Sequence, residues 1–216
     1  MRYKSDNSLS TNTKGEIIAN SITHALGVGL SIAGLVILIV RAVNRGTPWH
    51  LASYIIFGIS LLLLYSASTI YHSFSTKPWK AVLQRLDHAA IYFLIAGTYT
   101  PFMLTKIRTG LSWSILGVIW GLAIVGLIIK LGFSSKFKKP TVLLYLLMGW
   151  AGVVVFIQAG SLIGKLSLTF LLIGGAFYTV GVIFYRWKRL PFNHAIWHLF
   201  VLGGSIFHYF SVLQLA

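Results

Sequence analysis

The chain contains no cysteine among its 216 residues, which excludes disulfide bonds and thiolate-ligated metal sites. Acidic residues are almost as scarce, since Asp6, Glu16 and Asp87 are the only three. Charged residues make up 10% of the chain, against roughly 25% in an average soluble domain. Hydrophobic residues make up 56%. This composition excludes an ordinary water-soluble domain and predicts a protein that lies within a membrane.

Long stretches without any charged residue divide the sequence. Each has 18 residues or more, and about 20 apolar residues span the hydrocarbon core of a bilayer as an α-helix. The stretches do not alternate polar and apolar residues, as the strands of a membrane barrel would. We therefore predict an all-α integral membrane protein, a seven-transmembrane-helix bundle built on the stretches 17–40, 46–76, 88–105, 109–129, 140–164, 166–185 and 190–216.

The predicted organisation is a polar leader over residues 1–15 and a single seven-helix membrane domain over residues 16–216. The first apolar stretch is longer than the roughly 7–15 apolar residues of a signal peptide, so we expect it to be a retained helix. Connections rich in proline and charge place the helices at about 17–41, 50–72, 87–105, 111–130, 140–160, 165–186 and 192–214.

Basic residues dominate the charge and give a net value of +15. Thirteen of the 18 fall in the leader and in alternate connections, and five fall on the opposite side of the predicted membrane. Because the side richer in Lys and Arg faces the cytoplasm, we predict a cytoplasmic N-terminus and an outside C-terminus. Nucleic-acid binding is not expected, because the charges are dispersed rather than clustered in a base-reading patch. The expected setting is a bacterial plasma membrane, with membrane lipids as partners.

Three histidines have the arrangement of a zinc site. His194 and His198 are four residues apart and therefore share one face of the last predicted helix. His72 ends the second predicted helix on the same side of the membrane. Three imidazoles are the protein ligands of a catalytic zinc ion that keeps a fourth position for water. Zinc is thus the predicted cofactor, although the glutamate of the HExxH motif is absent between the paired histidines.

Asp87 is the candidate catalytic acid or base, because it opens the third predicted helix at the same membrane depth as the histidines. It is also suited to orienting a metal ligand through a hydrogen bond, or simply to starting a helix, where an acid is favourable. Ser68 lies one turn before His72 and is the second candidate catalytic residue, as a hydrogen-bonding group within the site.

Four other polar residues are candidates for supporting or cavity-lining positions. Glu16, Asn20 and His24 recur every four residues and form one polar stripe facing the bundle. Glu16 fits equally well as the third helical residue of a capping box that begins at Thr13. His208 lies about 15 Å deeper than His198 by helical rise, so it cannot share the same ion. It either packs in the interior or lines a cavity.

These residues belong to longer motifs that together resemble the haemolysin III family, the bacterial branch of the progestin and adipoQ receptor superfamily. The similarity covers essentially the full length. The motifs are Glu16-xxx-Asn20-xxx-His24, Ser68-xxx-His72, RLDHAAIYFLIAGTYTPF at 85–102, MGW at 148–150 and HAIWHLFVLGGSIFHYF at 194–210.

The resemblance implies a seven-helix protein with a zinc ion near the cytoplasmic face, held by His72, His194 and His198. It also implies that Asp87 lies near the zinc-bound water. Because the family is similar to alkaline ceramidases, a zinc-dependent hydrolase of a lipid amide or acyl bond, involved in membrane lipid homeostasis, is the expected function. Two alternatives stay open. One is a non-catalytic lipid sensor with a structural zinc, and the other is the pore-forming cytolysin that the family name implies.

Overall fold

Helices account for nearly all of the described chain. The computed structural model describes residues 13–74, 77–132 and 141–216, and every regular element within them is an α-helix. The predicted class, an all-α membrane protein, is confirmed. The elements are α1 (Lys14–Arg45), α2 (Pro48–Ser73), α3 (Lys77–Thr105), α4 (Gly110–Gly132), α5 (Thr141–Trp150), α6 (Val153–Gln158), α7 (Gly160–Ile163), α8 (Lys165–Arg186) and α9 (Asn193–Leu213).

Five of these helices, α1, α2, α4, α8 and α9, are long and apolar enough to cross a membrane. The outer surface of α1 fits this setting, because large apolar side chains such as Ile22, Leu26 and Val43 are more than half exposed. The predicted span at 140–160 is divided into α5 and α6 by a turn at residues 151–152. The exact number of seven spans and the orientation in the membrane stay predictions.

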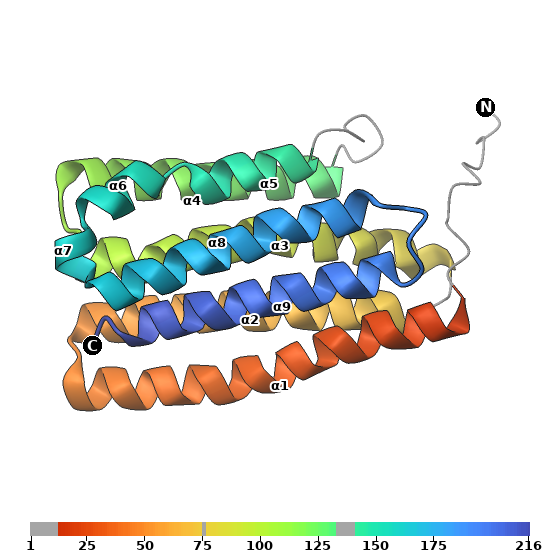
Figure 1. The fold of residues 1–216 in the computed structure, drawn as a ribbon, viewed down its shortest axis with the longest axis horizontal. Helices are drawn as coiled ribbons and strands as arrows, with labels where there is room; N and C mark the ends of the chain where they lie inside the picture. Colours follow the sequence, from red (N-terminus) through yellow and green to blue (C-terminus); the bar gives the residue numbers. More distant parts are fainter. Residues whose placement is uncertain (1–12, 75–76, 133–140) are drawn as a thin grey trace.

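The long helices lie side by side along one axis of the molecule (Figure 1). At one edge of the bundle α1 packs against α2 and α9, and at the other edge α4 packs against α3. Helix α8 pairs with α9 in the interior of the view. The start of α1 and the end of α9 lie at opposite ends of the bundle (Figure 1). We call the end at which α1, α3 and α9 begin the α1-start end.

Helix α3 begins at Lys77, so the prediction that Asp87 opens this helix is wrong. Lys80 and Arg85 lie just before the charge-free stretch 88–105, on which the predicted start of the helix was based. A helix tolerates both residues, because Lys and Arg have favourable helix propensities. The charge boundary therefore locates where the sequence becomes polar and not where the helix starts. Asp87 lies within α3 and is 6% exposed.

The start of α1 is a capping box, which confirms that interpretation of Glu16. The Thr13 N–H donates to Glu16 Oε2 at 2.8 Å, and the Glu16 N–H donates to Thr13 Oγ1 at 3.2 Å. The second carboxylate oxygen accepts from the Phe192 N–H at 3.2 Å. Exposed Glu16 thus ties the start of α1 to the segment that leads into α9, and it lies outside the buried part of the Glu16–Asn20–His24 stripe.

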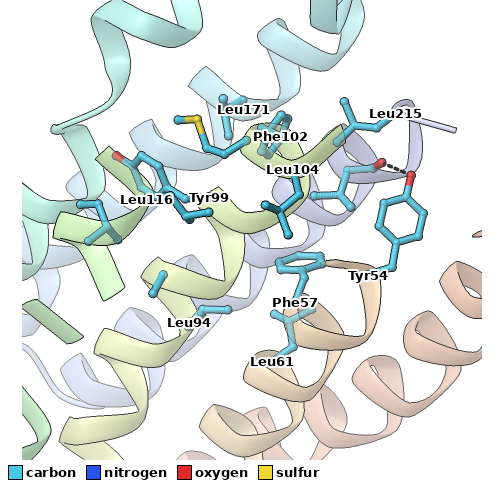
Figure 2. Packing of buried hydrophobic residues seen from close by; sticks show 14 of the residues in the cluster. Tyr54, Phe57, Leu61, Leu94, Tyr99, Phe102, Leu104, Leu116, Leu171 and Leu215 are labelled. Carbon is cyan, nitrogen blue, oxygen red and sulfur yellow. Dashed lines mark hydrogen bonds between the residues drawn. The ribbon is translucent and has the colours of Figure 1, made fainter. Parts of the chain in front are cut away.

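Buried aromatic and aliphatic side chains fix the opposite end of the bundle (Figure 2). Tyr54 and Phe57 of α2 are fully buried, and the Tyr54 hydroxyl donates to the Val212 carbonyl at 3.0 Å. The His50 Nε2–H donates to the Leu215 carbonyl at 3.0 Å. These contacts hold the end of α9 against the start of α2. Because the two helices run in opposite directions, the start of α9 then meets the end of α2.

Gly27 allows α1 to approach α2 closely near the α1-start end. A Cβ atom at this position would lie 2.3 Å from Tyr65 Cδ1, which is too close for any real contact. The Tyr65 hydroxyl donates to Ser205 Oγ at 2.7 Å, so the same tyrosine also joins α2 to α9. Any displacement of Tyr65 therefore disturbs the packing of three helices.

We expect Gly27→Ala to lower the thermal unfolding midpoint of the detergent-purified protein, because an overpacked core costs about 1–3 kcal/mol. The matched control is Gly29→Ala, two residues along α1, where a Cβ meets nothing within 4 Å. Alanine is favoured over glycine in a helix by about 1 kcal/mol, so this control retains or raises the midpoint. Equal effects of the two substitutions would contradict the close contact with Tyr65.

Candidate metal centre

The end of α2 and the start of α9 bring three histidines together, as their positions in the sequence predict. One potential ligand atom from each of His72, His194 and His198 lies within 4.8 Å of the other two. The ring centroids are separated by 4.9 Å for His72 and His194, 5.0 Å for His72 and His198, and 4.5 Å for His194 and His198. The i, i+4 pair on α9 therefore faces the single imidazole from α2.

The Nε2 atoms of this cluster are available to a metal ion, because they have no hydrogen-bond partner. The Nε2 atoms of His72, His194 and His198 are all buried and accept or donate no hydrogen bond. Buried polar atoms are nearly always hydrogen-bonded, so three unpartnered nitrogens at one point require an explanation. Neutral imidazole is a common metal ligand, with zinc–nitrogen bonds of about 2.0–2.1 Å. A shared cation satisfies all three atoms at once.

Hydrogen bonds from α1 fix the tautomer of His198, which is fully buried. Its Nδ1 lies 3.1 Å from Thr23 Oγ1 and 3.2 Å from the Asn20 carbonyl oxygen. Because the carbonyl can only accept, and the Thr23 hydroxyl proton is directed to the carbonyls of Ala19 and Asn20, Nδ1 carries the proton. The lone pair is then on Nε2, the nitrogen that a metal would use. Partners of this kind orient metal-binding histidines in many proteins.

His24 and Asn20 also reach the centre from α1. The His24 ring stacks on the His198 ring with centroids 3.5 Å apart and planes 19° from parallel. The Tyr65 ring lies nearly perpendicular to the His24 ring, with centroids 5.1 Å apart. His24 and Asn20 are 2% and 1% exposed, and none of their side-chain nitrogen and oxygen atoms has a hydrogen-bond partner. The structure thus places both residues beside the three-histidine cluster.

Asp87 and Ser68 lie together next to the cluster but are not part of it. Ser68 is one turn before His72 on α2, and it is 1% exposed with an unpartnered hydroxyl. The hydroxyl lies near the Asp87 carboxyl without a hydrogen bond of standard geometry, and the carboxyl also interacts electrostatically with Tyr71 and Tyr185. The carboxyl group therefore lies near hydroxyl-bearing side chains. Arg85, two residues before Asp87, donates to the Leu131 carbonyl at 3.3 Å.

A partly open cavity of about 670 Å³ extends from this region into the bundle. His24, Asp87, His88 and Tyr185 line it at the α1-start end. Its walls are mostly apolar side chains from α3, α5, α8 and α9, including Ile91, Ile95, Leu146, Leu172 and Val201. Its volume falls within the range of about 300–1,000 Å³ that ligand pockets occupy.

His208 lines the deep part of the same cavity, apart from the three-histidine cluster. Its Nε2–H donates to the Leu171 carbonyl at 3.1 Å, and its ring lies 5.2 Å from that of Tyr178. A Cβ on Gly174 would lie 2.2 Å from His208 Cδ2, so the ring is also tightly packed against α8. Both roles considered from the sequence, packing and cavity lining, are therefore present.

The sequence does not identify two residues of this region, Thr23 and His88, as part of the site. Thr23 offers no signal except its place next to His24, because its role depends on the crossing of α1 and α9. His88 is easily taken for an interfacial residue that faces away from Asp87. In the structure it lines the cavity with Asp87, interacts electrostatically with His72, and its carbonyl accepts from the Tyr145 hydroxyl at 2.8 Å.

Comparison with known protein families agrees with this arrangement. A family model described as "Haemolysin-III related" matches residues 14–209, which include every residue of the centre. The chain belongs to the haemolysin III family. This family member is 46% identical over 198 residues to the hemolysin-3 homolog of Bacillus subtilis, an alignment that covers 92% of this chain and 93% of the relative. It is a multi-pass cell-membrane protein.

Two further relatives show how widely the haemolysin III fold extends. Hemolysin-3 of Bacillus cereus is 47% identical over 198 residues, which are 92% of this chain and 90% of the relative. The human monocyte to macrophage differentiation factor is 31% identical over 207 residues, which are 91% of this chain and 83% of the relative. The similarity therefore extends over the bundle as a whole and is not confined to the histidine motifs.

The first prediction for the centre concerns metal content. Because two imidazoles are a poor substitute for three, His194→Ala is expected to purify with less than about a tenth of the wild-type metal content. The control is His50→Gln, which removes an imidazole at the other end of the bundle but keeps an N–H donor for the Leu215 carbonyl. This variant is expected to retain the metal. Elemental analysis of both variants, after identical purification, gives the answer. Equal metal content in both variants would contradict the assignment of the ligands.

A second prediction concerns the support that Thr23 gives to His198. Thr23→Val preserves the shape of the side chain and removes its hydroxyl, so the orientation of His198 is weakened. We expect about ten- to a hundredfold weaker metal affinity, the usual cost of losing such a partner. Thr69→Val is the matched control, because its hydroxyl bonds only the Tyr65 carbonyl within α2. Competition with a calibrated chelator measures both affinities, and equal values for the two variants would refute the role of Thr23.

Proposed function

We propose that this haemolysin III family member is a zinc-dependent membrane hydrolase that cleaves an amide or acyl bond of a lipid and serves membrane lipid homeostasis. One observation carries the proposal: three convergent, unpartnered imidazole nitrogens lie beside a buried carboxyl group at the head of a lipid-sized cavity. In the proposed reaction the imidazoles are the metal site, the carboxyl group is the proton acceptor, and the cavity holds the acyl chain.

The three histidines are the proposed zinc ligands. His72, His194 and His198 present neutral nitrogens, which suit zinc, and the chain has no cysteine to compete with them. A bound zinc ion supplies Lewis acidity, which polarises a carbonyl oxygen and lowers the pKa of water. The protein's own contribution is to hold the imidazoles in one orientation, through Thr23 and Asn20 in the case of His198.

Asp87 is the proposed proton acceptor and Ser68 its hydrogen-bonding neighbour. Amide hydrolysis requires that a proton leave the attacking water and that a proton reach the departing nitrogen. A carboxylate at the head of the cavity can accept the first proton and, once protonated, donate the second. The described residues offer no other buried acid, since Glu16 is exposed in the cap of α1. The Ser68 hydroxyl orients the Asp87 carboxyl or donates to the substrate.

The cavity is the proposed site of the acyl chain. Asp87 and Thr98 both line it and are eleven residues apart on α3, a depth of about 16 Å by helical rise. A long apolar substituent inside the cavity would be shielded from water by Ile91, Ile95 and their neighbours. The susceptible carbonyl would then lie at the head of the cavity, near the histidines. Lys130 and Arg186 also line this end and suit the head-group side of the lipid.

A non-catalytic lipid sensor with a structural zinc is the second candidate, and His24 is the observation that favours it. Structural zinc sites have four protein ligands. His24 stacks on His198 and has two unpartnered nitrogens, so it is the side chain best placed to complete such a site. A sensor of this kind would bind lipid and lose stability without zinc, but it would show no turnover.

The test of the proposed hydrolase is turnover of N-acyl lipids by the purified protein in mixed micelles, followed as released fatty acid. Asp87→Asn is expected to lower kcat by about a hundredfold or more while the metal is retained, because a general acid–base group contributes about 10²–10⁴. Glu16→Gln is the matched control and keeps near-normal turnover. A metal-replete wild type that releases no fatty acid from any acyl-amide or ester lipid would exclude the hydrolase and leave the sensor.

A further inference from the structure

Asn20 and His24 are the most unusual polar residues of the bundle that the proposed reaction does not use. They are four residues apart on α1 and share its buried face. Both nitrogen atoms of the imidazole, and both the oxygen and the nitrogen of the amide, are buried without a partner. Unsatisfied buried groups are rare in proteins because they are costly, and four atoms on two adjacent side chains indicate a missing ligand or water.

Their surroundings indicate where such a ligand would lie. His24 contacts the rings of His198 and Tyr65, and it lines the cavity that Asp87 also lines. The backbone carbonyl of Asn20 lies 3.2 Å from His198 Nδ1, so this residue is adjacent to the same histidine. His24 therefore lines the cavity beside the metal centre, and Asn20 lies one turn before it on the same face of α1. Asp87 lines the same cavity from α3.

The chemistry of the pair favours an oxygen ligand. A neutral imidazole offers one N–H donor, and the Asn20 amide offers two more. The one acid in the described part of α1 is Glu16, and its carboxylate already accepts hydrogen bonds from the Thr13 and Phe192 N–H groups. Several N–H donors near one point, without a competing carboxylate, suit an oxygen that carries partial or full negative charge.

We propose that Asn20 and His24 form an acyl-oxygen subsite, which hydrogen-bonds the carbonyl or carboxylate oxygen of a lipid whose chain occupies the cavity. The inference rests on the proposed function for the identity of the lipid, and it deepens that function by assigning the group that positions the acyl head. The subsite requires neutral His24 and Asn20 as donors and does not require either residue to bind the metal.

The experiment compares the binding of hexadecanoate and hexadecanol, which share a chain and differ in the oxygen-bearing head. Equilibrium binding to the metal-replete wild type is expected to favour the carboxylate by at least tenfold. His24→Phe keeps a stacking ring and Asn20→Leu keeps the approximate size, but both remove donors. Each is expected to reduce the preference by about tenfold, as for loss of a hydrogen bond to a charged group, with metal content and hexadecanol affinity unchanged.

Ser31→Ala is the matched control, because Ser31 is buried on the same helix but bonds the Gly27 carbonyl, and the variant keeps the preference. His24→Gln restores an N–H donor and is expected to recover part of the preference that His24→Phe loses. Asn20→Leu decides the question alone if His24→Phe does not fold.

Three results would overturn the subsite. Loss of metal in His24→Phe would make His24 a fourth ligand, and an unchanged preference in the donor-free variants would show that the side chains hold water only. Absence of any preference in the wild type would also exclude it. Failure of the proposed hydrolase is a separate result, since a protein that prefers the carboxylate through Asn20 and His24 but never turns over a lipid retains the subsite.

Discussion

The cost of burying imidazoles without partners is the constraint on which the centre of this protein depends. His72, His194 and His198 each turn a buried, unpartnered Nε2 toward the other two. In a bundle whose outer surface faces lipid, water is not freely available to satisfy these atoms. In the account proposed here a shared cation resolves the conflict, because one ion would accept all three lone pairs. The buried polar residues around it, Asn20, His24, Ser68 and Asp87, then belong to a single site rather than to unrelated defects of packing.

The far end of the bundle is built to hold this site in place. Contacts of His50 and Tyr54 with the backbone around the end of α9 hold that end of the helix against the start of α2. Gly27 lets α1 approach closely enough for Thr23 and Asn20 to reach His198. Rigid helices support a metal centre better than loops do. The cavity beside the centre is lined in part by α5 and α6, which a turn at residues 151–152 separates.

Much of this could be predicted from the sequence, since charge-free stretches give the helices and the spacing of His194 and His198 gives their common face. His72 follows from topology, because the end of one helix and the start of another meet at the same membrane depth. Other features could not be predicted. The start of α3 could not be predicted, because charged residues show where the apolar stretch begins and not where the helix begins. The contact of Thr23 with His198, and the stacking of His24 upon it, depend on how α1 crosses α9, which no local pattern encodes.

The most direct test of the account is X-ray absorption spectroscopy at the zinc edge on the purified, detergent-solubilised protein. We predict one zinc per chain with three imidazole nitrogens at about 2.0–2.1 Å and one additional light ligand that is not imidazole. A spectrum with four imidazoles would assign His24 to the metal and close the site to substrate. A protein that carries no metal, or whose metal lacks imidazole ligands, would contradict the central claim that the three histidines share one ion.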